Sequence, residues 1–169
     1  MSQLKSVLFD TTPVNVFAVL DGASIPGLLD RLFQFRPRHV CLLRGKLTPD
    51  MAEVAPYLIA LDAQNGFTEW VLKHAKQKNW GIFFRSVLNE KQLRRNLREL
   101  LRAELPDGRQ VMFRFYDPRT LNVYLPSCTT PELETFFKDV YDIVLEDDEN
   151  KVTRRFHLAN GSLLQEVLH

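Results

Sequence analysis

Hydrophobic residues follow two alternating patterns along the chain, and their order predicts strands separated by helices. Compact runs rich in β-branched and aromatic residues, which are typical of buried strands, occupy residues 14–20, 39–43, 57–61 and 80–85. After the first run, apolar residues recur at helical spacing from Ser24 until the sequence RPRH ends the pattern. A second helix is predicted from Thr68, a candidate N-cap, to about Lys78.

A longer helix is predicted from Asn89 to about Arg102. Asn89 and Gln92 have the spacing of a capping box, and leucines recur behind them at helical intervals. Lysine and arginine also recur along this helix, which makes a surface for nucleic acid or for an acidic partner one interpretation. The i,i+4 pair Glu90–Arg94 favours an ordinary exposed helix face instead.

The second half of the chain continues the alternation. A Pro-Asp-Gly turn precedes a predicted strand at 110–116; helices are then predicted at 118–125, 131–137 and 162–169, and strands at 141–145 and 152–158. This order predicts an α/β fold in which residues 1–169 form a single domain. We expect a mixed central sheet of about five to seven strands flanked by helices.

Composition narrows the class of protein. The 169 residues are 45% hydrophobic, so the chain can bury a core without disulfides or a metal. The 22 Lys and Arg residues nearly balance 21 Asp and Glu residues, which argues against a nucleic-acid binder. The first ten residues lack the apolar region of a signal peptide, and no stretch approaches the roughly 20 apolar residues of a membrane span. We therefore expect a cytoplasmic protein in which Cys41 and Cys128 are reduced, half-buried thiols.

The stretch VMFRFYDPR, residues 111–119, combines aromatic, basic and acidic residues. If it begins as a strand, alternation places Arg114 among large apolar neighbours, where a guanidinium requires a carboxylate partner. Asp21 and Asp62 each follow an apolar run and are the candidate partners. The stretch is therefore expected to hold two distant segments together.

Asp117 and Pro118 predict the start of a helix, with Asp117 as the N-cap and Pro118 at the first helical position. An alternative is that Arg114 and Arg119 bind an anion such as phosphate. The Asp117 carboxylate would compete with that anion for the same backbone N–H groups, so the sequence favours a structural role.

Several segments resemble the DUF4123 family of domains of unknown function. FRFYDPR (113–119) resembles the family signature, and VFAVLDGA (16–23), APYLIAL (55–61) and WGIFFRSVLNEKQLRRNLRELL (80–101) resemble its other segments in the same order. The family-like core spans 14–138, and 139–169 is a variable region. The residues that the resemblance assigns to the family signature are Asp21, Gly22, Pro56, Phe113, Arg114, Phe115, Tyr116, Asp117, Pro118 and Arg119.

The resemblance implies a cytoplasmic adaptor or chaperone of the bacterial type VI secretion system. Such a protein binds a secreted effector and promotes its loading onto the spike protein, VgrG. It implies no catalysis and no cofactor. The alternative is a small hydrolase or anion-binding enzyme with an Arg/Asp cleft around Asp21, Arg114, Asp117 and Arg119.

The residues give little sign of a metal or catalytic site. Only His39 and Cys41 among the candidate ligands share one face of a predicted strand, and zinc takes three or four protein ligands. Cys128 has no histidine nearby in sequence to activate it. The acidic run 146–149 lacks the spacing of a calcium loop, so we expect a solvated turn; the alternative is an acidic rim for a partner.

The last residues carry an apolar pattern that suggests a partner. Leu163, Leu164, Val167 and Leu168 fall on one side of the helix predicted at 162–169. That helix either docks on the domain or binds a partner, and we expect these four residues to be partner-binding candidates. The pattern makes no prediction of the oligomeric state.

Overall fold

Seven strands form the central sheet of the computed structural model, which describes residues 3–76 and 78–168. They are β1 (Asn15–Asp21), β2 (His39–Cys41), β3 (Pro56–Leu61), β4 (Gly81–Ser86), β7 (Val140–Asp147), β8 (Val152–Ala159) and β9 (Ser162–Leu168). Their order in the sheet is β2-β3-β1-β4-β7-β8-β9. The predicted α/β class is confirmed, and the described strand pairs are all antiparallel rather than mixed in direction.

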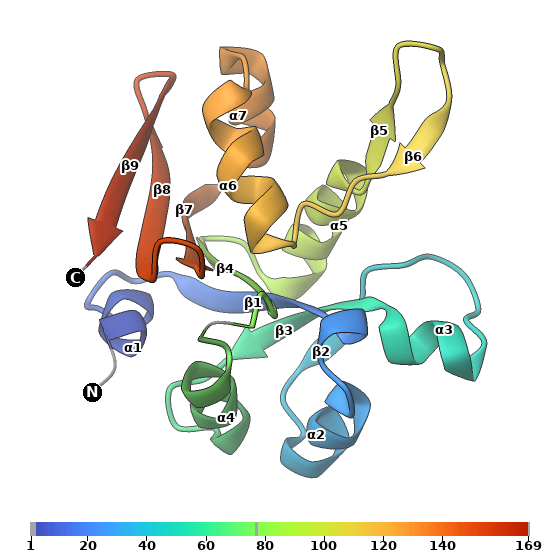
Figure 1. Ribbon diagram of the computed structural model, residues 1–169. Helices are drawn as coiled ribbons and strands as arrows, with labels where there is room; N and C mark the ends of the chain where they lie inside the picture. The colour runs from blue at the N-terminus through green and yellow to red at the C-terminus, as the bar shows by residue number, and fades with distance from the viewer. Residues whose placement is uncertain (1–2, 77, 169) are drawn as a thin grey trace.

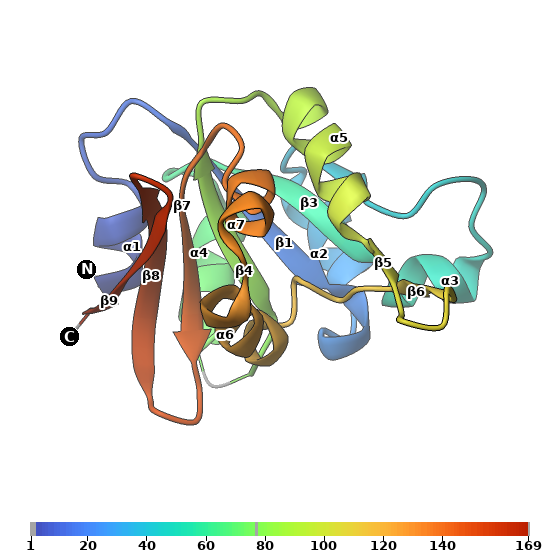
Figure 2. The ribbon, with the colours of Figure 1, turned by 90° about the horizontal axis from the view of Figure 1, so that it is seen from above.

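Helices cover both faces of the sheet (Figure 1). On one face lie α1 (Gln3–Leu8), α2 (Leu28–Phe35) and α4 (Gly66–His74); on the other lie α5 (Glu90–Leu100), α6 (Pro118–Ser127) and α7 (Thr130–Phe136). Figure 2, which is a view from above, shows α5, α6 and α7 in front of the sheet. Along the chain, the short helix α3 (Pro49–Val54) connects β2 to β3, and a 3-10 turn, η1 (Gly22–Ser24), follows β1.

Alternation along β1 divides the apolar residues between two cores. Ala18 and Leu20 belong to the first core, which contacts α1, α2 and α4, whereas Phe17 and Val19 belong to the second core under α5, α6 and α7. Because the middle strands are covered on both faces, they appear in the sequence as nearly continuous apolar runs. The four strands in the first half of the chain were predicted from those runs. One boundary differs, because β2 ends at Cys41 rather than continuing to Leu43.

Helix starts differ in two places from the prediction. Asn65, not Thr68, caps α4, because the Asn65 side chain accepts a hydrogen bond from the Phe67 amide; Thr68 is a buried residue inside the helix. That helix ends at His74 and does not reach Lys78. Ser24 lies in η1, and α2 begins only after Gly27, which has a left-handed φ of 75°. The predicted capping box of Asn89 and Gln92 is confirmed in α5.

The strand predicted at 110–116 is wrong beyond Met112. Residues Gln110–Met112 form β6, which pairs with β5 (Arg102–Glu104) in a two-stranded hairpin outside the main sheet (Figure 1). From Phe113 onward the chain leaves the hairpin and turns toward α6. The Phe113 amide still donates to the Leu101 carbonyl, but the Phe115 and Asp117 amides donate to carbonyls within the turn itself.

The helix predicted at 162–169 is also wrong, because residues Ser162–Leu168 form β9; His169 lies outside the described residues. Asn160 and Gly161 both have positive φ, 50° and 77°, as a tight two-residue hairpin turn requires. The turn returns the chain antiparallel to β8, from Ala159↔Ser162 to Thr153↔Leu168. Leucines at 163, 164 and 168 fit helical spacing, but the turn before them decides the structure.

Candidate functional site

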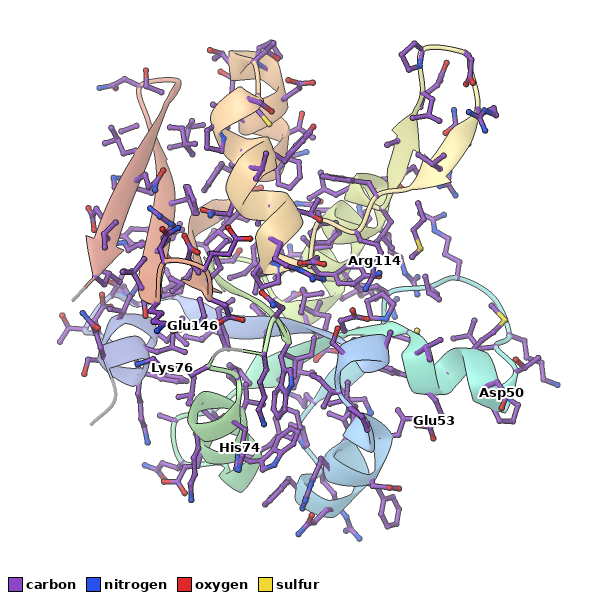
Figure 3. The ribbon with its side chains drawn as sticks, in the orientation of Figure 1. Asp50, Glu53, His74, Lys76, Arg114 and Glu146 are labelled. Atoms are coloured by element: carbon purple, nitrogen blue, oxygen red, sulfur yellow. The ribbon has the colours of Figure 1, made fainter. Side chains whose placement is uncertain are left out.

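The residues that resemble the family signature come together at the carboxyl end of β1. Asp21 is the last residue of that strand, Pro56 lies opposite it on β3, and Gly22 begins the turn that follows. Figure 3 shows Arg114 above this end of β1, beside the start of α6. We call Asp21, Gly22, Pro56 and residues 113–119 the signature corner.

Asp21 and Arg114 join the two halves of the corner. The Arg114 guanidinium contacts Asp21 Oδ2, which confirms one of the two predicted partners. Asp21 also accepts hydrogen bonds from the Ala23 amide (3.1 Å) and the Ser24 hydroxyl (2.8 Å). Burial alone would lower the pKa of Arg114, but the Asp21 carboxylate and the Tyr116 side chain together outweigh it and raise that pKa.

Two details of the Arg114 prediction are wrong. Asp62 is exposed and accepts a hydrogen bond from the Gln64 amide, so it is not a partner of Arg114. The Arg114 side chain is 47% exposed rather than enclosed by apolar residues. The physical reason is that residues 113–116 form a turn, so the alternation of a strand does not apply; one face of the guanidinium lies over the Tyr116 ring, 5.7 Å from its centre.

Asp117 caps α6 as predicted. Its Oδ1 accepts hydrogen bonds from the Arg119 amide and Nε, both at 3.0 Å, and its Oδ2 accepts from Arg119 Nη2 at 2.8 Å. Burial alone would raise the pKa of Asp117, but the hydrogen bonds from Arg119 outweigh it and lower that pKa. Arg119 is therefore held at the positive end of the helix by the residue that caps it.

Gly22 permits a close contact between backbone segments. A Cβ atom at this position would lie 2.5 Å from the Glu53 carbonyl oxygen and 2.6 Å from that of Ala55. The Gly22 amide donates to the same Ala55 carbonyl at 3.0 Å. The end of α3, on which Figure 3 labels Glu53, is thereby held against the turn after β1.

The aromatic residues of the corner anchor it in the second core. Phe115 and Tyr116 are almost fully buried, and the Phe115 ring lies edge-on to Phe84 of β4 at 6.5 Å between ring centres. Phe113 packs 4.7 Å from the ring centre of Tyr124 on α6. Charged and aromatic groups together fix the segment between β6 and α6 onto the sheet.

The geometry gives little support to an anion site at the two arginines. Arg114 and Arg119 each contact their own aspartate, so an anion would compete with an existing carboxylate at both. A cavity of about 80 Å³ does adjoin Arg119, but Arg114 does not line it. Its other lining residues include Glu146, Asp147, Asp148 and Glu149, which would repel an anion.

Part of the acidic run is buried. Glu146 and Asp147 complete β7, and burial raises the pKa of Glu146. Asp147 accepts hydrogen bonds from Asn122, Asn150 and Arg154, so this carboxylate joins α6 to the β7–β8 turn. The expectation of a solvated turn therefore fails for these two residues.

The predicted metal-ligand and thiol candidates form no cluster. Among the described residues, no group of three or more His, Cys, Asp and Glu side chains is placed to hold a metal ion. His39 Nδ1 lies 2.8 Å from the Pro37 carbonyl oxygen. Cys41 and Cys128 are free, half-buried thiols as predicted, and burial raises the pKa of both, which disfavours the reactive thiolate.

The basic helix α5 contains an arginine with an internal role. Arg98 donates to the carbonyl oxygens of Leu42, Cys41 and Leu43, at 3.0 to 3.2 Å, and so fixes the chain after β2. Beside it, a groove of about 530 Å³ separates α5 and the segment after β2 from the β5–β6 hairpin. Its lining includes Leu42, Leu43, Leu101, Val111 and Met112.

A buried ionic cluster was missed by the sequence analysis. Arg85 of β4 is fully buried and donates to both oxygens of Asp142 of β7, at 2.8 and 2.5 Å. It also contacts Asp10, at 2.7 Å, and the Val7 carbonyl, at 2.8 Å, which ties α1 and the segment after it to the sheet. The available signal was the arginine within the run WGIFFR, since a buried strand must supply a partner for it.

The four predicted partner-binding residues lie on β9. Leu163 packs against the second core, whereas Leu164 and Val167 are 45% and 39% exposed. Within the described chain, β9 pairs with β8 on one side, and its other side is an edge of the sheet. The structure therefore places these residues on an exposed strand edge instead of a helix face.

Comparison with known proteins gives one match. A family model described as a domain of unknown function (DUF4123) matches residues 16–135, which is more than half of the chain and includes the whole signature corner. Curated proteins and solved structures give no match. Within the described residues, no helix is both long enough and apolar enough to cross a membrane.

Proposed function

Because the chain belongs to the DUF4123 family, we propose that it is a cytoplasmic adaptor that binds a type VI secretion effector and promotes its loading onto VgrG. The observation that carries the proposal is the family match over residues 16–135, within which the complete signature FRFYDPR occurs. Binding, rather than catalysis, is the activity that we assign to this chain.

The chemistry of the signature corner supports a binding protein. Its two carboxylates, Asp21 and Asp117, are both nearly buried and are already occupied by arginine and by backbone N–H groups. A general base or nucleophile needs a lone pair directed at a substrate, and these groups direct theirs at the protein. The corner therefore stabilises the fold that presents the recognition surface.

The alternative is a small hydrolase or anion-binding enzyme at the same residues. It requires Arg114 and Arg119 to converge on one open pocket. Arg119 lines a small acidic cavity that Arg114 does not share, so the geometry favours the adaptor.

An affinity purification tests the proposal. The tagged protein is isolated from bacteria that express a type VI system, and the proteins that accompany it are identified by mass spectrometry. We expect one effector in stoichiometric amount, with or without VgrG. Recovery of no stoichiometric partner by a folded wild-type protein, in cells shown to express the effectors, would overturn the adaptor role.

Arg114→Ala separates recognition from folding in this experiment. Because we assign Arg114 to the fold, the variant should retain the effector under conditions where circular dichroism shows it to be folded. Selective loss of the effector by a folded Arg114→Ala protein would instead place the binding surface at the signature corner.

A further inference from the structure

Among the described residues, no strand pairs with the outer side of β9, so the backbone groups on that side lack a strand partner. The turn Asn160–Gly161 is closed by the pair Ala159↔Ser162, which is a hydrogen-bonded pair in a two-residue hairpin. Opposite residues in an antiparallel ladder alternate between bonded and non-bonded pairs. The N–H and C=O groups of Leu163, Gln165 and Val167 therefore point away from β8.

This edge has little of the usual protection against pairing. Natural proteins block free edges with charged side chains, above all lysine, with proline, bulges or very short strands, or with a covering helix or loop. β9 has seven residues, SLLQEVL, with one charge, Glu166, and neither lysine nor proline, and its register with β8 runs without a shift. The opposite edge of the sheet, β2, has only three residues and closely follows Pro37. The contrast indicates that β9 is kept available for pairing.

We propose that β9 receives an extended segment of the effector as an added, eighth strand of the sheet. The inference rests on the adaptor function proposed above and identifies the surface and the chemistry of its partner. Main-chain hydrogen bonds to Leu163, Gln165 and Val167 supply the binding, and side chains on both sides of the added strand supply the selectivity.

The side chains of β9 define the segment that fits. Leu163 and Val167 lie on one face of the sheet with Gln165, and Leu164 and Leu168 lie on the other with Glu166. Glu166 is the one charged residue of the strand; its side chain is 46% exposed, and its contact with Arg155 is long, at 3.4 Å. The matching segment therefore alternates apolar residues on both faces and carries Lys or Arg beside Glu166.

The charge of Glu166 also favours an effector strand over a second copy of this chain as the occupant of the edge. Two copies of β9 that overlap fully in antiparallel register pair Gln165 with its own equivalent. That register opposes Glu166 to Leu164 of the other copy, so the two Glu166 side chains become diagonal neighbours on one face. An unlike strand replaces this repulsion with attraction, so we assign the edge to the effector.

Gln165→Pro tests the edge with little effect on the hairpin. The Gln165 N–H points outward, so proline removes a donor from the free edge without removing a hydrogen bond to β8. Gln165→Thr, which keeps the outward N–H and suits a strand, is the matched control. Circular dichroism and thermal unfolding establish that both variants fold, and Val167→Lys provides a second edge block should Gln165→Pro fail to fold.

The probe is the protein that accompanies the wild-type chain from the bacterial cytoplasm, identified by mass spectrometry as a type VI effector and then purified. We expect Gln165→Pro to weaken its binding by at least about tenfold and Gln165→Thr to leave it within about twofold. Hydrogen exchange at the Leu163, Gln165 and Val167 amides should slow in the wild-type complex, because these amides gain acceptors.

The outcomes separate this inference from the adaptor function. Equal binding by wild type and Gln165→Pro would overturn the strand-addition site and leave the adaptor function standing. Failure of the wild-type chain to recover an effector would overturn both. If light scattering shows a wild-type dimer that Gln165→Pro converts to a monomer, a second copy occupies the edge and the effector assignment is wrong.

Discussion

The Arg114 guanidinium contacts the Asp21 carboxylate, although the two residues lie 93 positions apart in the chain. Asp21 ends a central strand, and Arg114 lies in the turn between the β5–β6 hairpin and α6. The contact closes a long loop that contains β2, β3, β4 and α5. Since Asp21 is 3% exposed at its side chain, its carboxylate depends on the partners that the fold supplies.

Arg114→Ala should lower the free energy of unfolding by about 1–2 kcal/mol, because a hydrogen-bonded partner of a buried carboxylate is lost. The loss is limited because Asp21 keeps its bonds from Ala23 and Ser24 and because half of the Arg114 side chain is in solvent. Urea denaturation measures the change. Arg109→Ala is the matched control, since Arg109 pairs with Asp107 only two positions away in an exposed turn. Equal losses in the two variants would refute the special role of the long-range contact.

Gly22→Ala should destabilise the protein by about 1–3 kcal/mol, because the added methyl group meets two backbone carbonyl oxygens that cannot move independently. Gly66→Ala is the comparison: there the new Cβ lies 2.8 Å from the ring of Phe35, which is a half-buried side chain rather than backbone. Thermal unfolding of both variants measures the difference. A larger loss for Gly66→Ala would show that the approach of α3 to the turn after β1 is not tight.

The sequence predicted those elements that depend on local signals. The run VNVFAVL became β1, the Asn89–Gln92 pair formed its capping box, and Asp117–Pro118 began α6. Each of these signals lies within a few neighbouring residues. They are an apolar run for a strand buried on both faces, a side-chain cap, and the fixed φ of proline. Together they were sufficient for the α/β class and for one of the two proposed Arg114 partners.

Elements that depend on distant pairing were predicted less well. Leu163, Leu164 and Leu168 have helical spacing, yet their backbone is extended because the Asn160–Gly161 turn brings β9 against β8. The turn at 113–116 carries the alternating pattern of a strand, but no strand of the described chain pairs with it. Periodicity records which side chains are apolar, and it does not record which backbone segment supplies the hydrogen bonds.

Arg85→Met should lower the free energy of unfolding by about 3–5 kcal/mol, because it leaves the buried Asp142 carboxylate without its main partner. The double variant Arg85→Met/Asp142→Leu should recover part of that loss, since it also removes the buried carboxylate, for which Arg155 at 2.9 Å would be the remaining cationic partner. Denaturation of the single and double variants forms the test. A double variant that loses the sum of the two single losses would contradict a direct coupling between these residues.

Leu163→Ala and Leu164→Ala distinguish the two faces of β9. Leu163 packs against the second core, so its truncation should cost about 1–2 kcal/mol, whereas Leu164, at 45% exposure, should cost no more than about 0.5 kcal/mol. Chemical denaturation of the isolated protein measures both. The reverse order would mean that β9 presents its other face to the domain, and the side-chain match proposed for the effector strand would then be wrong.

Asp147→Asn should reveal a pH-dependent contribution of the acidic run. Burial alone would raise the pKa of Asp147, but hydrogen bonds from Asn150 and Arg154 outweigh it and lower the pKa from 3.8 to about 2. A carboxyl with this shift contributes roughly 2 kcal/mol to stability at neutral pH, fully present above about pH 4 and lost as the pH falls toward 2. The wild-type advantage over Asp147→Asn should therefore be largest near pH 7 and vanish near pH 2.

The free energies of unfolding of wild type and Asp147→Asn must be compared with each other at each pH. The reason is that the protonation of Glu146 changes stability with pH in the direction opposite to that of Asp147. Burial raises the pKa of Glu146, so its protonation on acidification favours the folded state. Glu146→Gln should accordingly stabilise the protein at pH 7, with a benefit that fades as the pH falls through the raised pKa of Glu146 and is gone below the ordinary pKa of a glutamate. Urea denaturation of the three proteins from pH 2 to pH 7 separates the two carboxyls. A constant difference between wild type and Asp147→Asn across this range would show that hydrogen-bond geometry, rather than the charge of Asp147, stabilises the β7–β8 turn.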